Sequence, residues 1–278
     1  MMSESIEEAR AALRARQGSG ARYDAPAAPA RQLDWARRGT AYFARLLNEL
    51  SDRDLDAPSA LPGLSRRHII AHIGYHARLI SEMVAWARTG QLGPFPEAAQ
   101  VSTSDVVLGA SLPSRALRHL FDHSGVHLNV EWRDLSDAGW DASVEDAAGR
   151  RVTLRDTPEI RARALWLHAV DLAAGGRFAD MPPDFIDPLI RYYAAAYTGR
   201  PFSLSFSDRP EPLVVGNAPE IAVTGRAADI AQWLCGRGVR GLQVAGGVLP
   251  EEPRSTLGLI GPLPVELQIS SPTESGSS

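Results

Sequence analysis

The apolar positions of roughly the first 180 residues recur with helical spacing. In each helical stretch they return every three or four residues, and glycine or proline breakers separate the stretches. The segment between the last two stretches, residues 141–155, predicts a loop or short strands. Four long helices with short connections predict an antiparallel bundle, and they cover residues 33–50, 65–90, 113–135 and 158–174.

The pattern changes after about Pro182. One further helix is expected over residues 185–198, then strand-like alternation, then a helix over residues 226–238. Strands beside helices in a short segment predict a small α+β domain. The fold class is therefore α+β, a four-helix bundle followed by a small C-terminal domain. The expected divisions are an extension and linker at 1–30, the bundle at 31–180, the small domain at 181–270 and a disordered tail at 271–278.

The N-terminal extension begins with a short predicted helix. Ser5 can cap it, with Glu8 at the capping-box position, and a linker rich in glycine, alanine and proline follows. The start of the chain is acidic and amphipathic and has no apolar stretch of signal-peptide type. No apolar run is long enough to span a bilayer. We therefore expect a cytoplasmic protein that does not enter a membrane.

Composition excludes several classes of function. The formal net charge of −4 argues against nucleic acid as a partner, because phosphate binding needs a concentrated basic surface. The chain contains no lysine, which excludes Schiff-base chemistry and covalent pyridoxal phosphate. Its single cysteine, Cys235, excludes an internal disulfide.

Seven histidines are the first candidates for chemistry. Six fall into two sets spaced by four residues, so that each set forms a slanting stripe on a helix. For most of them a structural or surface role is the stronger expectation. His72 and His168 stand out because each lies beside the apolar face of its helix, and bundles build metal sites from facing helices. The two sets are His68, His72 and His76, and His119, His123 and His127.

Several stretches resemble a known family. "LPGLSRRHIIAHIGYHA", "AWARTGQ", "ALWLHAVDLAAGGRFADMPPDF" and "WLCGRG" are similar, in order and spacing, to the mycothiol-dependent maleylpyruvate isomerases, a branch of the DinB-like metal-binding bundles. The resemblance covers roughly Leu33 to Pro264. It implies an isomerase of aromatic degradation that uses a divalent metal, zinc, and a low-molecular-weight thiol.

The resemblance also implies a metal site with one position vacant. The family's two histidine ligands match His72 and His168, but its glutamate ligand, one turn before the second histidine, falls on Ala164. Three explanations stay open. His76 or Asp171 replaces the glutamate, or the bundle holds no metal, or position 164 has been altered deliberately. The family already has an aspartate at the position of Asp171, so its expected role is to orient an imidazole.

The reaction that the resemblance implies converts maleylpyruvate to fumarylpyruvate. A thiolate adds to the conjugated double bond, the resulting single bond rotates, and elimination restores the alkene. Cys235 is a more plausible packing residue than nucleophile, so the thiol is expected to be soluble. The substrate is a dicarboxylate, which arginine recognises well. Arg237 matches the small-domain arginine that the family places at the active site; alternatively it caps or pairs at a helix C-terminus.

Without the glutamate a metal would be held more weakly. A thiol that is already reactive near neutral pH, such as ergothioneine, would tolerate that loss, so mycothiol and ergothioneine are both expected cofactors. Two other functions stay open: a thiol S-transferase acting on another electrophile, and a metal-free DinB-like protein that binds a small anion. The sequence also leaves open a homo-oligomer.

Overall fold

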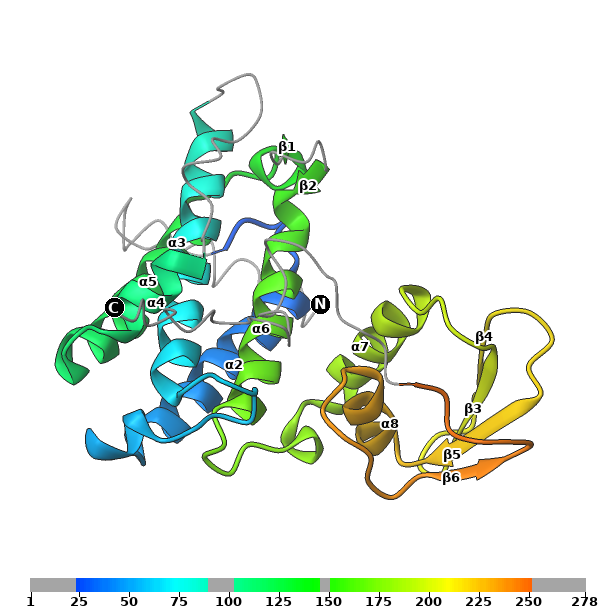
Figure 1. The fold of residues 1–278 in the computed structure, drawn as a ribbon. Helices are drawn as coiled ribbons and strands as arrows, with labels where there is room; N and C mark the ends of the chain where they lie inside the picture. Colours follow the sequence, from blue (N-terminus) through cyan, green and yellow to red (C-terminus); the bar gives the residue numbers. More distant parts are fainter. Residues whose placement is uncertain (1–23, 90–102, 146–150, 252–278) are drawn as a thin grey trace, which may run out of the picture.

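The computed structural model describes residues 24–89, 103–145 and 151–251. The predicted helix at residues 5–17, most of the linker after it and the predicted tail lie outside these residues. Within them, the chain folds into a helical bundle followed by a smaller part of helices and strands (Figure 1). The predicted α+β class is confirmed.

Four long helices form the bundle. Helix α3 packs mainly against α5, and α2 packs mainly against α6 (Figure 1). Three of them, α2, α3 and α5, bury a mainly apolar face, as the spacing of apolar residues predicts, whereas α6 is buried over most of its surface. The helices are α2 (Ala30–Asn48), α3 (Arg66–Arg88), α5 (Ser114–Asp134) and α6 (Thr157–Asp171).

The start of α3 shows how one histidine serves local structure. Ser65 is the N-cap and forms a capping box with His68. The backbone N–H of Ser65 donates to Nδ1 of His68 over 3.2 Å. His68 therefore replaces the glutamate or glutamine usual at this position, and its role is to hold the helix terminus.

Short elements connect the long helices. Strands β1 (Ser143–Glu145) and β2 (Arg151–Thr153) form an antiparallel pair where a loop or short strands were predicted. Helix α4 (Thr103–Ala110) was not predicted. The remaining connections contain the 3-10 turns η2 (Arg53–Asp56), η4 (Gly139–Asp141), η5 (Leu154–Asp156) and η6 (Phe178–Asp180).

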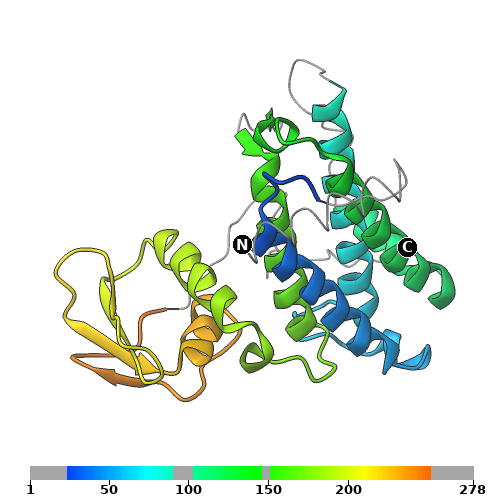
Figure 2. The same ribbon diagram turned by 180° about the vertical axis from the view of Figure 1, so that it is seen from behind.

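A four-stranded sheet and two helices follow the bundle. The strand order is β4-β3-β5-β6, with β3 parallel to β5 and the other two pairs antiparallel. Helices α7 and α8 lie on the side of the sheet that faces the bundle (Figures 1 and 2). The elements are α7 (Pro183–Ala195), β3 (Phe202–Phe206), β4 (Leu213–Val215), β5 (Ile221–Gly225), α8 (Ala227–Leu234) and β6 (Gln243–Ala245).

One apolar core runs from the bundle into the small domain. It joins side chains of α2, such as Leu33 and Trp35, to Phe185 of α7 and Trp233 of α8. The Trp35 indole N–H also donates to Asp184 at the start of α7 over 2.9 Å. A second apolar cluster fills the other end of the bundle. The small domain is therefore held firmly against the bundle. No helix in the described ranges has the length and hydropathy needed to cross a membrane.

A matched pair of glycine substitutions tests the packing of α2 on α6. A Cβ at Gly39 would lie 3.0 Å from Trp166 Nε1 and 3.1 Å from Leu165 Cβ, whereas one at Gly125 would meet Thr40 Cγ2 at 3.8 Å. Both changes to alanine gain about 1 kcal/mol of helix propensity. Crowding at Gly39 costs about 1–3 kcal/mol, so Gly39→Ala should unfold with a lower free energy than Gly125→Ala in urea. Equal free energies of unfolding would mean that the contact between α2 and α6 accommodates the added methyl group without losing stability.

Candidate functional site

The inner face of α6 carries a row of polar side chains that are buried in the bundle. Along it lie five side chains, each no more than 1% exposed, and four of them are polar. Their spacing alternates between four and three residues, which keeps them on one side of a helix. Buried polar groups are expensive unless they are paired, so this stripe marks the candidate site. Its members are Thr157, Arg161, Ala164, His168 and Asp171.

His72 of α3 and His168 of α6 meet in the bundle interior. Their ring centroids are 4.9 Å apart and the rings are nearly perpendicular. Both ring nitrogens of His72 are buried without a hydrogen-bond partner among the described residues. Burial, together with the charges of His168, His76 and Arg161, holds the pKa of His72 well below its ordinary value. His72 is therefore a neutral imidazole with lone-pair and N–H capacity to offer a ligand.

Asp171 holds the His168 ring. Its Oδ2 lies 2.9 Å from Nδ1 of His168, and both side chains are fully buried. A carboxylate at this nitrogen favours the tautomer with the proton on Nδ1 and the lone pair on Nε2. Burial lowers the pKa of His168 despite this carboxylate, so the ring is neutral at physiological pH.

Arg237 of the small domain pairs with the same carboxylate. Its Nε and Nη2 donate to the two oxygens of Asp171 over 3.1 and 2.8 Å. Burial alone would raise the pKa of Asp171, but the Arg237 guanidinium and the hydrogen bonds from His168 and Arg237 lower it to about 2. Asp171 is therefore a permanent anion that ties His168 of the bundle to the small domain.

The end of α8 positions Arg237. Gly236 has φ of 68° and Gly238 has φ of 86°, both in the left-handed region that favours glycine. The backbone N–H of Arg237 donates to the carbonyl of Gln232, whose side chain donates back to the Arg237 carbonyl over 2.9 Å. Arg237 Nη1 also donates to the Cys235 carbonyl over 2.6 Å. The guanidinium of Arg237 therefore both caps the helix and pairs with Asp171 of the candidate site.

Arg161 is a buried cation that the sequence reasoning missed. Its Nη1 donates to the Ile73 carbonyl over 2.7 Å and to Nδ1 of His76 over 3.2 Å. Burial lowers the pKa of Arg161 to about 9, which still leaves the guanidinium charged at neutral pH. Its helical spacing from His168 was the signal that could have placed it on the inner face.

The same contact bears on His76 as a substitute metal ligand. Because Nδ1 of His76 accepts from Arg161, a neutral His76 carries its proton on Nε2. Neither nitrogen then presents a lone pair to a metal. The described part of the chain brings His76 close to His72, with ring centroids 5.9 Å apart, but beside a guanidinium.

The donor set does not fit a metal centre with three protein ligands. Ala164 is 1% exposed and packs in the apolar cluster with residues such as Ile69. In residues 24–89, 103–145 and 151–251, no group of three histidine, cysteine, aspartate or glutamate side chains is arranged to hold a metal. Catalytic zinc usually has three protein ligands, and His72 and His168, the ligands that the family resemblance implies, would supply only two. Zinc binding therefore stays a prediction.

The other candidates of the sequence lie apart from this site. His119, His123 and His127 are exposed on α5 and line a surface groove between α3 and α5. Cys235 is buried in the core, and burial raises the pKa of its thiol far above the usual range. A protonated, buried thiol is a poor nucleophile, which agrees with a packing role.

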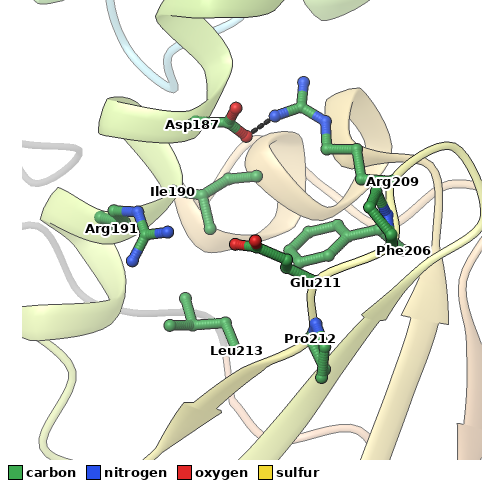
Figure 3. A pocket seen from close by; sticks show the side chains of 9 residues that line it. Asp187, Ile190, Arg191, Phe206, Arg209, Glu211, Pro212 and Leu213 are labelled. Carbon is green, nitrogen blue, oxygen red and sulfur yellow. Dashed lines mark ion pairs between the residues drawn. The ribbon is translucent and has the colours of Figure 1, made fainter.

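A cavity in the small domain is also separate from the site. It has a volume of about 260 Å³ and lies between α7 and the β3–β4 connection (Figure 3). Its charged side chains are mixed in sign. Asp187 and Arg209 form an ion pair, and Arg191 and Glu211 lie nearby. None of the buried histidines lines it.

The chain is similar to one family of known proteins. The family model described as the mycothiol maleylpyruvate isomerase N-terminal domain matches residues 36–173. No curated protein matches the chain. Two solved structures are similar over 81% of this chain and 96% of theirs, at 31% sequence identity. One is the mycothiol-dependent maleylpyruvate isomerase, with a TM-score of 0.72, and the other is a histidine-to-alanine mutant of it, with a TM-score of 0.73.

The fold and the site define a class of protein: a helical bundle with a buried pair of histidines, followed by a small α+β domain. An arginine of that domain pairs with the carboxylate that holds one of the histidines. With the likeness extending over nearly the whole of the solved structures, the chain belongs to the mycothiol-dependent maleylpyruvate isomerase family.

Proposed function

We propose that this protein catalyses the thiol-dependent cis–trans isomerisation of maleylpyruvate, the activity for which its structural relatives are named. One observation carries the proposal. His168 lies in ring contact with His72 and is tied to the small domain through Asp171 and Arg237, in a chain of this family.

The reaction needs a thiolate, a rotation and an elimination. The sulfur forms a bond to one carbon of the conjugated alkene, and the electron pair of the double bond moves onto the adjacent carbonyl as an enolate. The remaining single bond rotates. The enolate then re-forms the alkene in the trans geometry and expels the thiolate, so the thiol is regenerated and no oxidant or reductant is consumed.

The residues of the chain supply proton transfer and orientation. With its proton held on Nδ1 by Asp171, His168 can accept the thiol proton at Nε2. Asp171 stabilises the imidazolium that results, as in other Asp–His pairs. Arg237 acts through Asp171, so it is a positioning residue. His72 is in ring contact with His168 and has two ring nitrogens without a partner among the described residues.

The thiol is proposed to be a soluble cofactor of the mycothiol type. Cys235 is unsuited because it is buried and protonated. Ergothioneine is the second candidate, because a thiol that is reactive near neutral pH needs less activation. When bound, a divalent metal would lower the pKa of a coordinated thiol. The addition, rotation and elimination proposed here do not depend on a metal, since Ala164 leaves the set of metal ligands incomplete.

The test is the loss of maleylpyruvate absorbance with mycothiol, glutathione and ergothioneine supplied separately, with and without added zinc. We expect acceleration with mycothiol or ergothioneine. His72→Ala should lower the rate at least about tenfold, because it removes a group that faces the reacting atoms. His123→Ala, the same change at an exposed histidine of α5, should leave the rate unchanged.

Two outcomes point to other functions. No acceleration with any thiol would favour a small-anion-binding protein, which the incomplete ligand set and the buried cation Arg161 also suit. Thiol consumption with another electrophile, without isomerisation of maleylpyruvate, would identify an S-transferase.

A further inference from the structure

Besides the histidine site, the bundle has a cavity at the seam between α2 and α5, called here the seam cavity. It has a volume of about 180 Å³ and is lined by side chains of both helices and by Arg161 of α6. Since a water molecule takes up about 30 Å³, it has room for a small organic acid. None of its lining residues is acidic. The cavity is therefore a positively charged recess in the wall of the bundle.

Two arginines line this cavity, and Arg161 is the one with a guanidinium nitrogen that has no acceptor among the described residues. Arg37, at the same cavity, is occupied: its Nη1 and Nη2 donate to Asp24, each over 2.7 Å, and its Nε donates to Asn129 over 3.1 Å. Arg161 uses Nη1 for backbone and imidazole, and its Nη2 is buried with no hydrogen-bond partner among the described residues. A buried charged donor without an acceptor is costly, and an anionic ligand would supply the acceptor.

The small-domain cavity of Figure 3 provides the contrast. Its volume is larger, about 260 Å³, but its arginines are balanced by Asp187 and Glu211. An anion entering it would meet two carboxylates. The seam cavity has no such acid among its described lining residues, so of these two cavities it is the one that offers an anion a buried guanidinium.

We propose that Arg161 and the seam cavity form a carboxylate-binding site that holds one carboxylate of a small dicarboxylate substrate. In naming the dicarboxylate, this inference rests on the proposed function. Because Nη1 is committed to Ile73 and His76, the carboxylate is held through Nη2. Arg237 cannot serve in its place, since its guanidinium already pairs with Asp171 and its side chain is 4% exposed.

The experiment measures binding of maleate, a dicarboxylate, to the full-length protein in the presence of a chelator and without thiol. We expect calorimetry to detect binding and maleate to raise the melting temperature. Arg161→Met should bind maleate at least tenfold more weakly. It should still fold, with an unliganded melting temperature at or above that of the wild type, because an unpaired buried charge is replaced by an apolar chain. Arg209→Met, the control from the small-domain cavity, should bind as the wild type does.

A second variant blocks the cavity and keeps the arginine. Gly125 lines the cavity, so Gly125→Leu should fill it and weaken maleate binding. Maleate binding unchanged in Arg161→Met or Gly125→Leu, or absent from the wild type, would overturn the proposal. Failure of the isomerase would appear separately, as maleate binding that depends on Arg161 in a protein that does not isomerise maleylpyruvate with any thiol.

Discussion

Asp171→Asn is expected to lower the free energy of unfolding by about 3–5 kcal/mol, the cost of breaking a buried ion pair. The carboxylate is fully buried, accepts two hydrogen bonds from Arg237 and lies 2.9 Å from His168. Asparagine has nearly the same shape, so packing is conserved. The change removes the negative charge and leaves the Arg237 guanidinium buried without a counter-ion.

Denaturant unfolding of a double-mutant cycle measures this effect. Adding Arg237→Met to Asp171→Asn should recover most of the lost stability, because the uncompensated charge is removed. The control is Asp187→Asn, which breaks the Asp187–Arg209 pair. The Asp187 side chain is 53% exposed there, so we expect a cost below about 1 kcal/mol. Equal costs at Asp171 and Asp187 would refute the argument.

The same pair predicts how stability responds to acid. The pKa of Asp171 is lowered from 3.8 to about 2 in the folded protein. A lowered carboxyl pKa stabilises the fold at all pH values above the unfolded value, and that contribution is lost as the pH falls toward about 2. Asp171→Asn should therefore differ most from the wild type above pH 4 and converge with it in stronger acid, which unfolding curves at several pH values would measure.

The sequence predicted the long elements of the fold because they repeat an apolar period. The four bundle helices and α7 begin and end within a few residues of the predicted limits. Helix α4 was missed because its apolar residues do not mark one buried face: Val106 is buried while Val107 and Leu108 are exposed. Strand β6 was missed because it spans only Gln243–Ala245, and its pairing with β5 defines it.

The site was predictable where local spacing or the family resemblance carries it; the resemblance pointed to Asp171 and Arg237 as site residues, but not to their pairing. The interior placement of His72 and His168 follows from their helices, and the structure brings their rings together. The pairing of Asp171 with Arg237 joins residues far apart in the chain, and no local pattern encodes such a contact. Arg161 was not predicted because arginine side chains are usually exposed, whereas this one is 1% exposed on a helical face that apolar residues normally occupy.

Ala164→Glu is expected to raise the affinity of the protein for zinc at least about 100-fold. Position 164 is buried on the inner face of α6, one turn before His168, so a carboxylate there shares a helical face with the histidine. Together with His72 it completes the three protein ligands of a catalytic zinc site. Changes outside the ligand shell already alter metal affinity about 10–100-fold, so a ligand itself should count for more. Isothermal titration with zinc on both proteins is the measurement.

Arg161 could prevent Ala164→Glu from raising the zinc affinity, so the experiment needs two further variants. Arg161 lies three residues before position 164 on the same face of α6, so it could pair with the introduced carboxylate and withhold it from zinc. Ala164→Glu should therefore be compared with Ala164→Gln, which has the same size without the charge, and with Ala164→Glu combined with Arg161→Met. A gain that appears only in the combined variant would mean that Arg161 holds the carboxylate. No gain in either background would contradict the prediction, because a carboxylate free to reach two facing imidazoles should bind zinc with them.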